Sequence, residues 1–167
     1  MNASLGKTLV FFGTLGSLAL SVFRFFSSAL NVNLLTVFNI LSFVSTLVMA
    51  VGFFLSFRED TDIIWLIIGV LVLGSYPVSF IYPSLPGSVM SLIFIVLNTQ
   101  LLLWAFKLKD KNLPVALLLG ILFLWPIFGV SILARFINLT TYTTVYLMIN
   151  VITATVPVIA AFVDMKD

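Results

Sequence analysis

Long uninterrupted runs of apolar residues constrain this chain more than any other feature. The run from Leu34 to Phe57 contains no charged side chain, and it is long enough to cross a hydrocarbon core, which takes about 20 residues of helix. Lipid offers the backbone no hydrogen-bond partners, so a spanning segment must be a helix or part of a closed barrel. Barrel strands would alternate apolar and polar residues over about ten positions. The sequence therefore predicts an all-α bundle of transmembrane helices.

The amino-acid composition also indicates that the chain folds in lipid and not in water. Hydrophobic residues make up 62% of the 167 residues and charged residues only 8%, against about 25% charged residues in an ordinary soluble domain. Too little polar surface exists to cover a water-soluble body. We expect a single transmembrane domain over residues 1–167, with no soluble domain.

Six apolar stretches are separated by short polar connections. At about 1.5 Å of rise per residue, each stretch crosses most or all of a core that is about 30 Å thick. The predicted spans cover residues 8–26, 34–57, 63–82, 89–106, 115–136 and 145–163.

The basic residues predict an orientation, because they favour the cytoplasmic side of a membrane. If the N-terminus is cytoplasmic, six of the eight basic residues are cytoplasmic too: Lys7, Arg58, Lys107, Lys109, Lys111 and Lys166. Arg24 and Arg135 then face outward, and we interpret them as anchors at the headgroups. Trp65 and Trp104 fall at inner ends of spans, where aromatic residues are common. We expect a multi-pass protein of the cell membrane with both termini cytoplasmic.

Several chemistries are excluded by residue type. The chain has no cysteine and no histidine, so thiolate, disulfide and histidine-ligated sites cannot form within it. No carboxylate lies within a predicted span to activate a nucleophile. The net charge of +2 is scattered along the sequence, unlike the clustered basic face of a nucleic-acid-binding protein. We expect no enzyme activity, no cofactor, no metal and no nucleic-acid partner.

Neutral polar residues within the spans are the candidate site. Amide and hydroxyl groups in lipid must find partners, so they are expected to point inward. Two interpretations remain open: hydrogen bonds between helices, or a small polar pocket that opens outward. The candidate residues are Asn39, Tyr76, Asn98, Gln100, Asn150 and Thr153.

Small residues at four-residue spacing predict faces on which helices approach closely. One such face is Gly13, Ser17 and Ser21, and the other is Ser42, Thr46 and Ala50. Proline inside a span removes a helix hydrogen bond and predicts a kink. The prolines so placed are Pro77, Pro126 and Pro157.

A possible inverted repeat relates the two halves of the chain. The third and sixth spans each carry a Pro-Val pair, at Pro77 and Pro157. Gly52 precedes Arg58 by the same interval as Gly129 precedes Arg135. Three-span halves of opposite orientation are typical of transporters. The alternative is that similar apolar helices align by chance.

Two functions fit these features. An accessory or structural subunit of a larger membrane complex, such as a respiratory or transport assembly, fits the packing faces and short connections; its partners would be other membrane subunits or further copies of the chain. The alternative is a small neutral-solute transporter or channel component with an outward-facing polar pocket, which fits the repeat, the prolines and the amides.

Overall fold

All the secondary structure that the computed structural model describes is α-helical. The description covers residues 4–29, 34–81, 87–125 and 139–166. The helices in this part of the chain are α1 (Leu5–Ala29), α2 (Leu35–Asp60), α3 (Ile63–Ile81), α4 (Gly87–Leu108), α5 (Leu113–Leu124) and α7 (Leu139–Lys166). The prediction of an all-α protein is confirmed for these residues. A described helix overlaps each predicted span, but residue 82 of the third span and residues 126–136 of the fifth lie outside the description.

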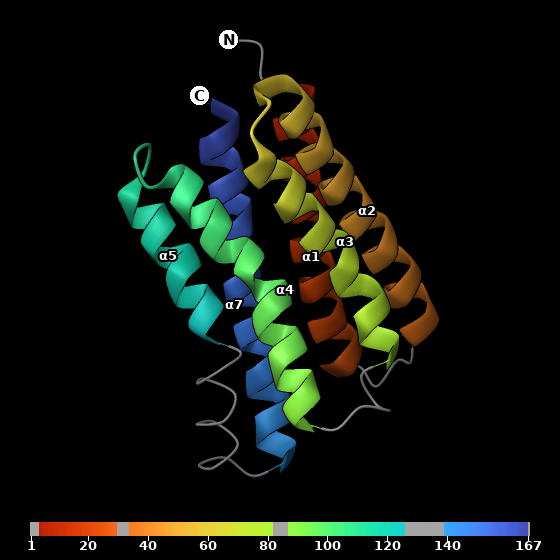
Figure 1. Cartoon of the computed structure of the whole chain (residues 1–167). Helices are drawn as coiled ribbons and strands as arrows, with labels where there is room; N and C mark the ends of the chain where they lie inside the picture. Colours follow the sequence, from red (N-terminus) through yellow and green to blue (C-terminus); the bar gives the residue numbers. More distant parts are fainter. Residues whose placement is uncertain (1–3, 30–33, 82–86, 126–138, 167) are drawn as a thin grey trace.

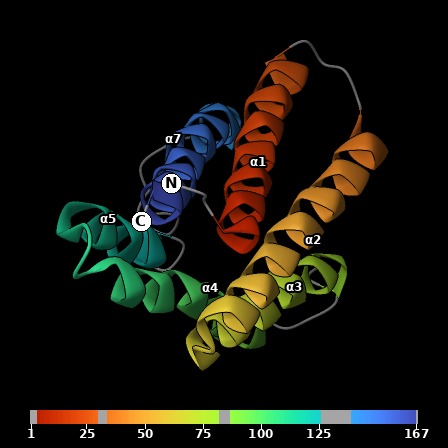
Figure 2. The same ribbon diagram turned by 90° about the horizontal axis from the view of Figure 1, so that it is seen from above.

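The helices form a ring in chain order. Each helix packs on the next one along the chain, and α7 packs on both α5 and α1, which closes the ring. Figure 1 shows the long axes running roughly together, and Figure 2 shows the ring from above. Neighbouring helices are antiparallel, so the start of α1 and the end of α7 lie at the same end of the molecule (Figure 1).

Three helices begin at that end, and each has a side-chain cap. Ser4 Oγ accepts a hydrogen bond from the backbone N–H of Lys7 at 3.1 Å, at the start of α1. Asp62 Oδ1 accepts from Ile64 N–H at 2.9 Å at the start of α3, and Asn112 Oδ1 accepts from Val115 N–H at 3.1 Å at the start of α5. Such caps satisfy backbone N–H groups that have no partner within the helix. We name this end, which carries residues 4–7, 58–65, 107–115 and 164–166, the charged end.

The outer surface of the ring is apolar. Among the described residues, more large hydrophobic side chains are exposed than buried, and Ile121, Ile152 and Leu92 are each more than 60% exposed. Three helices, over Leu5–Ser28, Thr36–Asp60 and Thr144–Lys166, are long and apolar enough to cross a membrane. Such an exterior needs lipid or another apolar partner around it.

The interior of the ring is filled near the charged end. Phe53 stacks on Trp65 with 5.8 Å between ring centroids and meets Trp104 edge-on at 5.3 Å. These three side chains are at most 3% exposed. Trp65 and Trp104 are therefore core residues and do not face the lipid, although their positions at span ends are typical of interface anchors.

Helices α1 and α2 touch backbone to backbone. A Cβ placed on Gly52 would lie 2.6 Å from Val10 N, and one on Gly6 would lie 2.6 Å from Ser56 N. Ser45 Oγ donates a hydrogen bond to the carbonyl oxygen of Gly13 at 2.7 Å, across the same interface. Glycine permits this approach because it has no Cβ.

A buried carboxylate joins the first and last helices. Asp164 on α7 lies 3.6 Å from the Lys7 ammonium on α1 and 3.2 Å from the Lys111 ammonium next to α5. The Asp164 side chain is only 7% exposed. Both lysines compensate its charge, as burial of a charge requires. The cluster therefore links α7 to α1, where the ring closes, and to the start of α5.

We predict that Gly52→Ala lowers the free energy of unfolding by about 1–3 kcal/mol, the usual cost of overpacking. The methyl group would meet backbone atoms, which cannot rotate away. Thermal unfolding in detergent measures the change. Gly120→Ala is the matched control, since no atom of the described residues outside its own helix backbone lies within 4 Å of its Cβ position. Equal stability of the two variants would contradict the close contact.

We predict that Asp164→Asn lowers stability by about 1–2 kcal/mol, because the hydrogen bond from Lys111 and the ion pair with Lys7 both lose their anionic partner. The same unfolding measurement applies. Asp110→Asn is the control at an exposed position, where changes stay within about 0.5 kcal/mol. If Asp164→Asn is as stable as the wild type, the cluster of Asp164 and its two lysines does not stabilise the closed ring.

Candidate functional site

A polar cavity occupies the interior of the ring in the half far from the charged end. It has a volume of about 340 Å³ and is bounded by α1, α4, α5 with the adjoining Trp125, and α7. The volume lies near the lower end of the range for small-molecule pockets, about 300–1,000 Å³. We name it the central cavity. Its polar lining residues are Ser21, Arg24, Asn98, Gln100, Trp125, Asn150 and Thr153.

Helix geometry explains why one wall of this cavity is polar. Asn150, Thr153 and Pro157 recur at intervals of three and four residues along α7, which places them on one face of the helix. That face also carries Ala154, and all four line the cavity. Ile152, between Asn150 and Thr153 in sequence, is 64% exposed on the outside of the ring. The alternation of polar inner positions and apolar outer ones thus follows the helical period.

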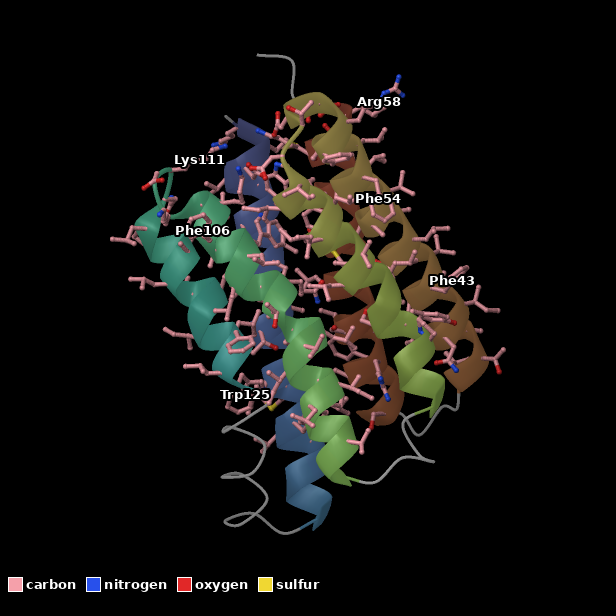
Figure 3. The ribbon with its side chains drawn as sticks, in the orientation of Figure 1. Phe43, Phe54, Arg58, Phe106, Lys111 and Trp125 are labelled. Carbon is pink, nitrogen blue, oxygen red and sulfur yellow. The ribbon has the colours of Figure 1, made fainter. Side chains whose placement is uncertain are left out.

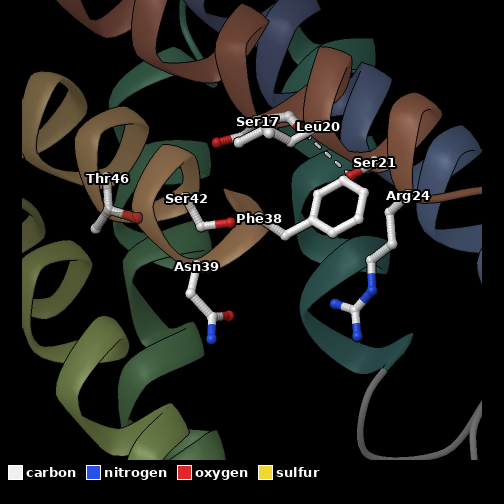
Figure 4. A pocket seen from close by; sticks show the side chains of 8 residues that line it. All are labelled: Ser17, Leu20, Ser21, Arg24, Phe38, Asn39, Ser42 and Thr46. Carbon is white, nitrogen blue, oxygen red and sulfur yellow. Dashed lines mark hydrogen bonds between the residues drawn. The ribbon is translucent and has the colours of Figure 1, made fainter. Parts of the chain in front are cut away.

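A second, smaller cavity lies between α1 and α2. Its volume is about 260 Å³, and Figure 4 shows its lining side chains. The residues are Ser17, Leu20, Ser21, Arg24, Phe38, Asn39, Ser42 and Thr46. Ser21 and Arg24 line both cavities, so the two hollows share one polar edge of α1.

Two buried polar atoms at the central cavity lack partners. Gln100 Oε1 and Trp125 Nε1 are both buried without a hydrogen bond. Trp104 Nε1 is also unpartnered, but it belongs to the aromatic core. An unmade hydrogen bond of this kind costs about 1–3 kcal/mol. Both atoms have essentially no accessible surface, so they lie behind the wall of the central cavity and do not face a molecule within it.

The polar residues predicted from sequence separate into three places. Asn98, Gln100, Asn150 and Thr153 come together around the central cavity. Asn39 lines the cavity between α1 and α2. Tyr76 is not among the described lining residues of either; its hydroxyl donates to the backbone oxygen of Asn39 at 3.3 Å.

Two of the predicted polar residues, Asn98 and Thr153, form hydrogen bonds within their own helix and not between helices. Asn98 Nδ2 donates to Phe94 O on its own helix at 2.8 Å, and the Thr153 hydroxyl donates to Asn150 O at 3.3 Å. The bond from Tyr76 does cross from α3 to α2. Intrahelical bonds leave Asn98 and Thr153 free to face the cavity.

The predicted packing faces divide along the helices. Gly13 and Ala50 are buried, with a Cβ on Gly13 only 2.7 Å from Met49 Cβ. Ser17 Oγ and Ser45 Oγ are 2.9 Å apart across the interface. Farther from the charged end, Ser21, Ser42 and Thr46 line the cavity between α1 and α2, as Ser17 also does.

The predicted prolines also fall in different settings. Pro77 lies inside α3 and Pro157 inside α7, and both helices continue past them. Pro126 lies outside the described residues, as do Gly129 and Arg135 of the possible repeat.

Ser45, at the contact between α1 and α2, and Arg24, which lines both cavities, are not among the site residues predicted from the sequence. Ser45 lies between two members of the predicted stripe on α2, and spacing alone does not select it. The sequence indicates a headgroup anchor at Arg24; the structure places it on the exposed surface of α1, which extends to Ala29. The signal that could have identified Arg24 is its isolation from every acidic residue in the sequence.

Charges are segregated along the molecule. Among the described residues, all five carboxylates lie at the charged end, and so do all three ion pairs. Arg24 lies roughly 25 Å along α1 from Lys7, and the structure shows no hydrogen bond or ion pair from it to a described residue. At such a distance a unit charge contributes under about 1 kcal/mol even at an effective dielectric constant of about 20. The cavity is therefore electropositive.

Asp62 lies at the charged end, and its pKa is lowered by its surroundings. A hydrogen bond from the Lys107 ammonium, with a second from Ile64 N–H, holds the pKa of this carboxyl below its ordinary value of 3.8. Both bonds favour the ionised form. Within the described residues no group of three acidic side chains is arranged to hold a metal ion.

Comparison with known proteins returned no relative. The chain matches no protein-family model, no curated protein and no solved structure.

We predict that stability falls at acidic pH partly through Asp62. A carboxyl with a lowered pKa in the folded state stabilises the protein above pH 3.8, and this contribution disappears as the pH falls through the folded-state pKa. Thermal unfolding between pH 6 and 3 should show a shallower decline for Asp62→Asn than for the wild type. Lys107→Met should give the same shallower profile, because it removes the main cause of the shift. Parallel profiles for all three proteins would contradict the assignment.

Proposed function

We propose that this chain is a polytopic membrane protein that binds a small polar solute in the central cavity and serves as a component of a transport system. In this proposal the chain crosses the membrane six times. The three long apolar helices support it, and so do the shorter apolar segments Ile63–Pro77, Leu92–Leu108 and Leu113–Leu124, which belong to the same ring.

The orientation we propose has the charged end in the cytoplasm. Support comes from the basic residues, since Lys7, Lys107, Lys109 and Lys111 gather at that end with Arg58 (Figure 3 labels Lys111 and Arg58 there). Positively charged connections are retained on the cytoplasmic side during insertion. The N-terminus and the C-terminus are then both cytoplasmic, and the half of the ring that holds the central cavity faces outward.

One observation carries the transport proposal: the ring is filled at one end and hollow and polar at the other. Phe53, Trp65 and Trp104 fill the interior near the charged end. The central cavity lies beyond them, toward Arg24 and Trp125. Polar groups inside a membrane bundle typically line substrate pathways, and a cavity blocked on one side has the form of a binding site that is accessible from the other.

The competing proposal is an accessory subunit of a larger membrane complex. The long apolar exterior supports it, because other subunits could cover that surface in place of lipid. It gives no reason for polar side chains of three helices to gather around one cavity. The two proposals differ in what they expect of water access and of copurifying chains.

We predict that Thr153→Cys reacts with a water-soluble thiosulfonate added outside intact cells, at a rate at least about tenfold above that of Ile152→Cys. The chain has no native cysteine, so each variant carries a single thiol. Thr153 lines the cavity and Ile152 faces outward from the ring. The reacting thiolate is disfavoured in apolar surroundings, so the lipid-facing thiol of Ile152→Cys is the matched control.

Equal rates for the two variants would contradict a water-accessible cavity. Native purification followed by mass spectrometry then tests the accessory role. Stoichiometric copurifying subunits, whose removal destabilises the chain, would favour that role over transport.

A further inference from the structure

We propose that Arg24 binds an oxyanion, a carboxylate or phosphate group, on the solute that occupies the central cavity. This inference rests on the proposed function and specifies the class of its substrate. It replaces the neutral solute expected from the sequence with an anionic one.

The position of Arg24 supports the assignment. Its side chain lines the central cavity and the cavity between α1 and α2, and α1 continues beyond it to Ala29. Figure 4 shows the guanidinium extending past the Phe38 ring, on the same side as the Asn39 amide. The guanidinium presents its N–H donors in a fixed, planar arrangement that matches carboxylate and phosphate oxygens.

The absence of an internal counterion is the second step. None of the described carboxylates lies in this half of the ring, and the three ion pairs of the described chain use only lysines. At the charged end, by contrast, the buried Asp164 carboxylate has two lysine partners. Arg24 is exposed; in a membrane-spanning helix a charge at that depth is stabilised by a partner or by the headgroups, and the described residues supply no counterion.

The neutral groups of the cavity specify the remainder of the ligand. Asn98, Asn150 and Thr153 line the cavity together with Arg24. Amide and hydroxyl side chains both donate and accept hydrogen bonds, so they fit a ligand that carries a hydroxyl or N–H donor as well as acceptor oxygens. Together with Arg24, these groups fit a small hydroxy- or amino-substituted carboxylate or phosphate, of a size compatible with about 340 Å³.

A lipid phosphate could supply the same oxyanion chemistry, because headgroups lie at the ends of the ring. The source can be distinguished experimentally by comparing a detergent without phosphate with a phospholipid bilayer. A headgroup would occupy Arg24 in the bilayer only.

The test uses Thr153→Cys as a reporter inside the cavity, in the purified full chain. Its labelling rates are measured with an anionic sulfonatoethyl thiosulfonate and with a cationic trimethylammonioethyl thiosulfonate. A neutral methyl thiosulfonate reports access alone. In a maltoside detergent, Arg24→Gln should lower the ratio of anionic to cationic rates by about tenfold, since a fixed charge in a cavity concentrates its counterions.

Arg24→Lys is the matched control, because it retains the charge and should retain the ratio. A ratio unchanged by Arg24→Gln, with neutral labelling intact, would overturn the inference while leaving the proposed function in place. Thr153→Cys that reacts with none of the three reagents would instead reject the proposed function itself.

Nanodiscs of phosphatidylcholine identify the source of the oxyanion. If the ratio of anionic to cationic labelling rates is as high in nanodiscs as in detergent, Arg24 is free to receive a soluble anion, as proposed. If it falls to the Arg24→Gln value in nanodiscs alone, a lipid phosphate occupies the guanidinium and the assignment to a solute is overturned.

Discussion

Contact between the first and last helices holds the ring of six described helices closed, and the central cavity depends on that closure. A helix chain that packs only on sequential neighbours would form an open sheet of helices with no interior. The α1–α7 contact converts the sheet into a ring, and Asp164 secures it with lysines from both sides of the junction. An even number of alternating helices permits this closure, because the first and last elements then meet antiparallel, with their charged ends together.

Side chains pack more closely at the charged end of the ring than at the other end, so the two ends of the molecule are not equivalent. Near the charged end, glycine and serine bring α1 and α2 into backbone contact, while three aromatic side chains fill the interior. Toward the other end, the same two helices diverge enough to leave a cavity edged by Ser21 and Arg24. Side-chain size accounts for both halves, since glycine admits close approach and serine and threonine do not fill the space that leucine or phenylalanine would occupy.

Helix type and approximate boundaries could be predicted from the sequence because lipid removes the alternatives for the backbone. The bundle interior was harder to predict. Four of the amide and hydroxyl residues singled out for their polarity share one cavity, whereas Asn39 is exposed. Tyr76 and Asn39 lie elsewhere because their helices, α3 and α2, occupy a different sector of the ring (Figure 2). Hydropathy does not determine the order of the helices around the ring. For that reason neither the burial of Trp65 and Trp104 nor the pairing of Asp164 with Lys7 could be predicted from the sequence.

The distribution of charge bears on what such a cavity can hold. An arginine at a membrane interface is ordinarily explained by snorkelling, which requires only a route for the side chain to the headgroups. Snorkelling does not account for the amide and hydroxyl side chains of Asn98, Asn150 and Thr153 at the same cavity as Arg24. A ligand that carries both an oxyanion and a hydrogen-bond donor has the groups to pair with the guanidinium and with these neutral side chains. Hydrogen bonds between charged groups are stronger than neutral ones, so the proposed cavity selects for that chemistry.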